Sequence, residues 1–130
     1  MKTRSKTAFT LVEIMIVIAI IMLLASVAIP SYIRSRKRTQ ATRILEDLRL
    51  LDNAVENYAI DTGKGPGNHP SFADLQNYIK TETALYSGSG TDLLGNNYGP
   101  FTVDSLPRVN PSTLAILSDV IDASFWSPYQ

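Results

Sequence analysis

The sequence predicts an α+β protein in which one long N-terminal α-helix packs on a small, loop-rich globular domain with short helices and a small sheet. Three observations lead to this prediction. Residues 9–29 are an almost unbroken apolar run, residues 30–61 carry an apolar stripe at helical spacing, and residues 62–130 hold short patterns separated by Gly, Pro, Ser and Thr. Residues 1–8 precede these parts as a short basic segment, which we expect to be a leader peptide.

Residues 9–29 are predicted to be the transmembrane half of the helix. Only Thr10, Glu13 and Ser26 are polar in these 21 residues. As a helix the run rises about 30 Å, which is enough to cross the apolar core of a bilayer. Because it is apolar on every face and the rest of the chain is too small to surround it, we expect membrane insertion rather than burial in the protein's own core.

Two kinds of membrane segment fit this run: a secretory signal that is cut off, and a membrane span that stays in the mature chain. Ser26-Val27-Ala28 suits a secretory signal that is cut after Ala28, with the basic residues at the start of the chain as its charged region. Glu13 argues against such a signal, because a carboxylate in the bilayer costs up to ~3 kcal/mol at the helix centre. An ionisable residue in a membrane span is a functional candidate, and Glu13 would also meet the positive end of the helix dipole, worth ~0.3–1 kcal/mol.

Residues 6–17, KTAFTLVEIMIV, closely resemble the N-terminus of type IV pilins and type II secretion pseudopilins. The resemblance implies a pilin-like fold and cleavage between Ala8 and Phe9 by a prepilin peptidase, followed by N-methylation of the new Phe9 amine. It implies that Glu13 pairs with the N-terminus of a neighbouring subunit during assembly. Pro30 matches the proline that ends the family's membrane segment, and it is expected to kink the helix because proline cannot donate a hydrogen bond. The family usually has glycine before the cut, where this chain has Ala8.

The resemblance implies a structural subunit, a prepilin, of a type II secretion pseudopilus or a type IV pilus-like filament, and not an enzyme. The expected partners are a prepilin peptidase and methylase, identical or related pilin subunits in a homopolymer, an inner-membrane assembly platform and membrane lipid. The expected place is the bacterial inner membrane, with a single pass and the C-terminal domain in the periplasm, and then an extracytoplasmic filament. The alternative is a membrane-anchored periplasmic binding module that does not polymerise.

The range 30–61 is predicted to be the amphipathic half of the helix. Its apolar stripe follows spacings of 4, 3, 4 and 3: Ile44, Leu48, Leu51, Val55 and Tyr58. This stripe is expected to pack on the chain's own globular domain. The helix should end near Asp61 or Thr62, because Gly63 is a C-terminal cap and a Gly- and Pro-containing segment follows. A basic cluster after the apolar run is expected to face lipid headgroups or an acidic neighbouring subunit: Arg34, Arg36, Lys37 and Arg38.

Short elements are predicted for the globular domain. Ser71 and Asp74 suit a capping box that starts a helix through about Ile79. Residues 81–97 are expected to be loop, residues 98–103 an edge strand, and residues 110–121 a second helix. Phe125 and Trp126 are expected to fill the core.

Several classes of function are disfavoured. The chain has no cysteine and its only histidine, His69, lies in a predicted turn, so thiolate chemistry is excluded and catalysis is not indicated. A formal net charge of zero gives no reason to expect nucleic-acid binding. Residues 92–98 weakly resemble a turn of major secretion pseudopilins. In that family an acidic loop further along the chain binds calcium. The acidic residues here lack the close spacing of a calcium loop, so neither a metal nor a cofactor is expected.

Overall fold

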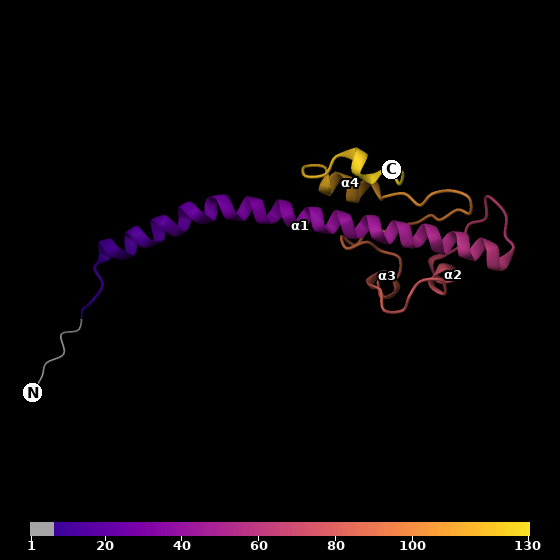
Figure 1. The fold of residues 1–130 in the computed structure, drawn as a ribbon, viewed down its shortest axis with the longest axis horizontal. Helices are drawn as coiled ribbons and strands as arrows, with labels where there is room; N and C mark the ends of the chain where they lie inside the picture. Colours follow the sequence, from indigo (N-terminus) through magenta and orange to yellow (C-terminus); the bar gives the residue numbers. More distant parts are fainter. Residues whose placement is uncertain (1–6) are drawn as a thin grey trace, which may run out of the picture. The chain divides into compact units, whose positions relative to one another are not determined.

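A computed structural model describes residues 7–130 of the chain. The elements in chain order are α1 (Leu11–Thr62), α2 (Phe72–Gln76), α3 (Ala84–Ser87), α4 (Pro111–Leu117) and a 3-10 helix, η1 (Ala123–Trp126) (Figure 1). The chain divides into two units, one ending at Arg36 and the other running from Lys37 to Gln130. The long helix predicted from the sequence is confirmed, and each unit has its own pattern of burial.

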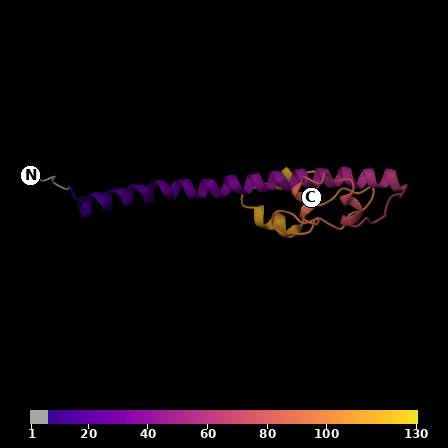
Figure 2. The ribbon, with the colours of Figure 1, turned by 90° about the horizontal axis from the view of Figure 1, so that it is seen from below.

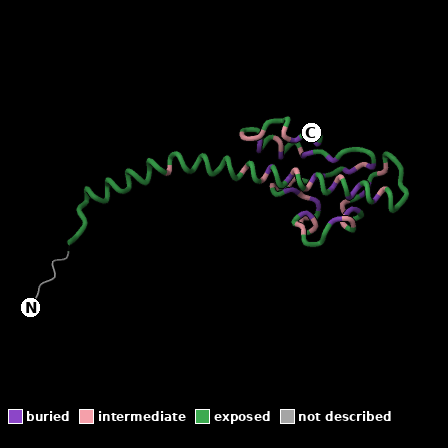
Figure 3. The backbone as a smooth tube through the Cα atoms, in the orientation of Figure 1, coloured by how far each residue is buried: buried purple, intermediate pink, exposed green. Residues whose placement is uncertain are grey.

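In the first unit, α1 exposes its apolar side chains all round. The large apolar residues from Phe9 to Ile33 have exposed fractions between 46% and 84% (Figure 3). By length and composition α1 is able to cross a membrane, and none of its most apolar 18-residue window is buried. Pro30 lies inside the helix, and the helical conformation continues on both sides of it. This unit therefore has no core of its own among the described residues, and its apolar surface needs an apolar environment from outside the chain.

In the second unit, α1 supplies the centre of the core. All five residues of the predicted stripe are buried, together with Ala41 and Ala54. They pack with buried residues of the globular domain: Leu75, Ile79, Leu85, Tyr98, Phe101, Val103, Val109, Leu117, Trp126 and Tyr129. In the view of Figure 1, α2 and α3 lie to one side of this part of α1 and α4 lies to the other, whereas Figure 2 shows most of the globular domain on one face of the helix. The prediction that the stripe packs on the chain's own globe is therefore confirmed.

Two predicted helix ends are also confirmed. α1 stops at Thr62, and Gly63 follows with a φ of 65°, the left-handed conformation that glycine adopts without strain at a helix C-terminus. At the start of α2, the Ser71 amide donates to Asp74 Oδ2 at 2.9 Å and the Asp74 amide donates to Ser71 Oγ at 3.4 Å. This reciprocal pair is the capping box expected from the sequence.

The predicted strand at residues 98–103 does not form. Residues 7–130 contain no strand, only an isolated bridge between Thr91 and Asn97, so the predicted small sheet was wrong. Pro100 has no amide hydrogen, and the Tyr98 amide donates to the Gly90 carbonyl at 3.0 Å instead of to a partner strand.

The short helices also differ from their predicted bounds. α3 forms inside the expected loop because Thr83 caps it, accepting from the Tyr86 amide at 3.3 Å. α2 ends at Gln76 and α4 at Leu117, both before their predicted ends. After each, the chain continues in turns, so that the buried Ile79 and the partly buried Ile121 still reach the core.

Side-chain hydrogen bonds close the loops of the globular domain. The Tyr98 hydroxyl donates to Asp47 of α1 at 2.9 Å, and burial raises the pKa of Asp47, against a smaller lowering by this hydrogen bond. Asp92 is buried and accepts from the amides of Leu94 and Asn96, each at 2.9 Å, and from the Thr113 hydroxyl. The turn at residues 92–98 is thus held by the Asp92 side chain and tied to α4 through Thr113.

A fragment that begins at Ser31 should be soluble, cooperatively folded and, at low protein concentration, monomeric, because it lacks the apolar run and keeps the core. Within it, Leu48→Ala should lower the free energy of unfolding by ~2–5 kcal/mol, since Leu48 is 0% exposed. Leu50→Ala is the matched control, because Leu50 is 40% exposed on the same helix and should matter far less. Size-exclusion chromatography and thermal unfolding measure these outcomes. An aggregated parent fragment, or equal losses for the two substitutions, would contradict the packing of the stripe.

Candidate processing and assembly site

The bond predicted to be cut lies in an accessible stretch of chain. Residues 7–10 precede α1 and have no regular secondary structure. Ala8 is exposed, and the Phe9 side chain is 84% exposed. A peptidase must bind its substrate as unfolded backbone, and here no helical hydrogen bond would have to break before the Ala8–Phe9 bond enters an active site. Cleavage and methylation at this bond remain predictions.

Thr10 caps the start of α1, which the sequence reasoning missed. The Glu13 amide donates to Thr10 Oγ1 at 3.2 Å, and the Thr10 amide donates to Glu13 Oε2 at 3.0 Å. The Ile14 amide donates to the Thr10 carbonyl at 3.4 Å and opens the helical ladder. This is a capping box of the Thr-x-x-Glu pattern, and that pattern in residues 10–13 could have predicted it.

The cap fixes the Glu13 carboxylate in the first turn of the helix. Oε2 accepts the Thr10 amide, while Oε1 has no hydrogen bond among the residues that the structure describes. In residues 7–130 the one ion pair is Lys37 with Asp119, at 2.7 Å, so Glu13 has no cationic partner there. The helix dipole favours a negative charge at this end. The geometry therefore leaves one carboxylate oxygen available to accept a charged donor from another molecule.

Pro30 does not belong to this site. It lies within α1, 17 residues after Glu13, on an exposed part of the helix. The structure thus gathers Ala8, Phe9 and Glu13 at the start of the helix and leaves Pro30 apart from them. The predicted kink at Pro30 stays a prediction.

Comparisons with known proteins agree with this reading of the N-terminus. The family model of the prokaryotic N-terminal methylation motif matches residues 3–29. A fimbrial protein of Pseudomonas aeruginosa is 42% identical over 88 residues, which is 67% of this chain and 56% of that protein. The type II secretion system core protein G of Aeromonas hydrophila is 30% identical over 77 residues, 59% of this chain and 54% of that protein. The type IV major pilin protein PilE1 of Neisseria gonorrhoeae is 32% identical over 103 residues, 67% of this chain and 62% of that protein.

The matched part spans only a little over half the length of these relatives. No solved structure is significantly similar to this chain. A methylation motif that leads directly into an exposed, membrane-compatible helix defines the class as proteins with a prepilin-type N-terminus. More particularly, the chain belongs to the type IV pilin and type II secretion pseudopilin family.

The capping box predicts different behaviour for two substitutions of Glu13. Glu13→Gln should keep the cap, because the glutamine side-chain oxygen also accepts the Thr10 amide. Glu13→Ala should lose the Thr10 bond and destabilise the first turn by about 0.5–2 kcal/mol, as loss of a cap does. Hydrogen exchange of the Thr10 amide in detergent micelles measures this, with Ser26→Ala as a control outside the first turn. Equal exchange rates in the parent and in both Glu13 variants would contradict the cap.

Proposed function

We propose that this chain is a prepilin, a structural subunit of a type II secretion pseudopilus or a type IV pilus-like filament. A peptidase cuts between Ala8 and Phe9, the Phe9 amine is methylated, and the mature chains then assemble. The observation that carries the proposal is a helix whose exposed apolar half lies within the methylation motif that matches residues 3–29. Such a helix is stable in the inner membrane and afterwards in a bundle of identical helices. In this proposal the C-terminal domain lies in the periplasm, and an inner-membrane platform drives assembly.

Cleavage changes the charge of the chain in a way that suits assembly. Removal of residues 1–8 takes away Lys2, Arg4 and Lys6 and leaves 9 basic against 12 acidic side chains, a formal net charge of −3. It also creates a positive amine at Phe9, directly before the capped first turn. The leader's positive charges thus serve the membrane-inserted precursor, and the new amine serves the filament.

The new amine and the Glu13 carboxylate are the charges that a filament core must accommodate. A buried charge without a partner is strongly unfavourable, and breaking a buried pair typically costs ~3–5 kcal/mol. Were residues 9–13 one continuous helix, the amine would lie about 6 Å from Glu13 along the axis. A neighbouring subunit's amine, offset along the fibre, can come closer to the unused Oε1. Because the surrounding apolar side chains are non-directional, this pair would fix the axial register of the subunits.

The mature protein should begin at Phe9 with a methylated amine, as mass spectrometry of the purified protein will measure. Ala8→Gly should be processed at least as well as the parent, because the family usually has glycine there. Ala8→Leu should block the cut, since a bulky residue stands where the motif has a small one. A mature chain that starts at Ile29 would instead establish a secretory signal, and a parent that retains residues 1–8 would contradict processing.

Glu13→Ala should leave membrane insertion intact or improve it, and it should leave the cut after Ala8 in place. Filament yield should fall roughly a hundredfold or more, because a buried charge pair is broken. Glu13→Gln should fall between the parent and Glu13→Ala, since it keeps the cap and a polar acceptor but has no charge. Yield is measured together with the membrane level and the mature N-terminus of each variant.

Thr10→Ala is the matched control for the role of Glu13, because it removes one hydrogen bond of the cap and keeps the carboxylate. It should assemble nearly as well as the parent. If Glu13→Gln assembles like the parent while Thr10→Ala does not, assembly depends on the cap rather than on the charge. If Glu13→Ala assembles normally at equal membrane level, the glutamate serves neither role in the filament.

A further inference from the structure

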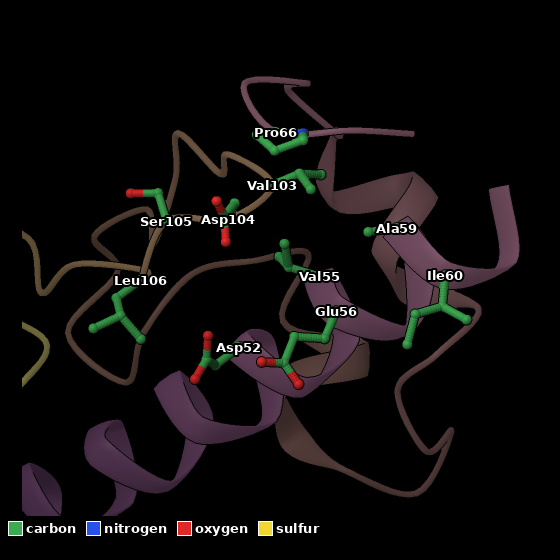
Figure 4. A pocket seen from close by; sticks show the side chains of 10 residues that line it. All are labelled: Asp52, Val55, Glu56, Ala59, Ile60, Pro66, Val103, Asp104, Ser105 and Leu106. Atoms are coloured by element: carbon green, nitrogen blue, oxygen red, sulfur yellow. The ribbon is translucent and has the colours of Figure 1, made fainter. Parts of the chain in front are cut away.

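The second unit carries an open groove of about 500 Å³ between the last turns of α1 and the loop at residues 103–106 (Figure 4). Apolar side chains of both elements, and Pro66 from the segment after α1, line it: Val55, Ala59, Ile60, Pro66, Val103 and Leu106. Ile60 is 81% exposed and Leu106 is 44% exposed. Apolar side chains this exposed at the rim of a groove are typical of a surface that another molecule covers.

Three carboxylates accompany this apolar lining: Asp52, Glu56 and Asp104. Asp52 and Glu56 lie on successive turns of α1, and Asp104 lies on the facing loop (Figure 4). Burial and the nearby Glu56 carboxylate raise the pKa of Asp52, against a smaller lowering by a hydrogen bond from Tyr129. In the described part of the chain none of the three has an ion-pair partner. The groove therefore presents apolar contacts and uncompensated negative charge to the same occupant.

A segment of the first unit has the complementary chemistry. Arg36 is four residues after Tyr32 and three after Ile33 on α1, so each of these apolar side chains is its neighbour on the helix surface. Tyr32 is 69% exposed, Ile33 is 49% exposed, and Arg36 is exposed with no ion pair among residues 7–130. This Tyr32–Arg36 face follows the apolar run directly and combines two apolar side chains with a cation.

We propose that the groove binds the Tyr32–Arg36 face of a second copy of this chain. The inference rests on the proposed filament function and names one contact that builds the filament. Tyr32 and Ile33 of one copy cover the apolar lining of the groove, and Arg36 approaches the Asp52 and Glu56 carboxylates of the other. A helix whose apolar side chains enter a groove flanked by opposite charges is a recurring mode of recognition, in which the charges set partner and register.

Only another copy can supply this face, because the groove and the face belong to one continuous helix, which cannot fold back on itself. Arg36 precedes Asp52 by 16 residues, and Tyr32 precedes Val55 by 23. At ~1.5 Å per residue the two copies would be staggered by roughly 25–35 Å along their helices. The contact is heterologous, since the face of one subunit meets the groove of the next, and such contacts repeat without end into a filament.

Charge reversal in the full-length chain tests the electrostatic part of the contact. Arg36→Glu and Glu56→Arg should each lower filament yield about tenfold at equal membrane level and with the same mature N-terminus, because each replaces an attraction with a repulsion. The double variant should recover most of the yield. Arg108→Glu and Glu82→Arg are matched controls, since both residues are exposed and neither lines the groove. Single reversals without effect, or a double variant no better than the singles, would overturn the proposal.

Cross-linking between copies tests the contact directly, and the absence of cysteine from the chain makes it specific. Chains with Arg36→Cys and chains with Glu56→Cys are produced in the same cell, and the filaments are treated with a short bis-maleimide. Cross-linked heterodimers should form, and they should be lost when Glu82→Cys replaces Glu56→Cys. Filaments without the Arg36–Glu56 heterodimer would overturn this contact and leave the filament function standing. A parent chain that forms no filament would overturn both.

Discussion

The structure depends on one constraint: the first half of α1 exposes apolar side chains on every face, and none of residues 7–130 covers them. A helix satisfies its own backbone hydrogen bonds, so it can leave water without leaving polar groups unpaired. The polar side chain of Ser26 is also paired within the helix, because its hydroxyl donates to the Leu23 carbonyl at 2.6 Å. The segment is therefore suited first to lipid and then to other helices of its own kind, and both environments are equally apolar.

From Ala41 onward the same helix buries one face in the globular domain. Here α1 is the centre of the hydrophobic core, whereas its first half has no core to pack against among the described residues. The globular domain has no disulfide to hold it, and residues 7–130 have no sheet. Its short helices and loops are ordered by packing on α1 and by bonds such as Tyr98 to Asp47 and Lys37 to Asp119. A loop-rich domain of this size buries little on its own, so its stability is tied to the helix on which it lies.

Local patterns account for what the sequence predicted correctly. The stripe from Ile44 to Tyr58, the end of α1 at Gly63 and the box at Ser71 depend on residues a few positions apart. The strand at residues 98–103 did not form because its backbone bonds go to two different loops, at Gly90 and at the more distant Asn68, which periodicity does not reveal. The groove was equally out of reach, since α1 and the loop with Asp104 meet only in the folded chain. The Thr10 cap, in contrast, could have been predicted from the local Thr-x-x-Glu pattern at residues 10–13.

The capping box shows how one Glu13 carboxylate can have two roles, one at the start of its own helix and one toward another subunit. From the sequence, one carboxylate is expected to meet the helix dipole and also to pair with a charge on another subunit. In the structure the cap occupies Oε2 and leaves Oε1 unused, so one side chain can serve both roles. The cap also holds the carboxylate in a single geometry, which reduces the conformational entropy that an intermolecular pair would otherwise lose on forming. In the proposed filament, helix initiation and subunit registration would reinforce each other, because the bond that starts the helix also fixes the position of the charge.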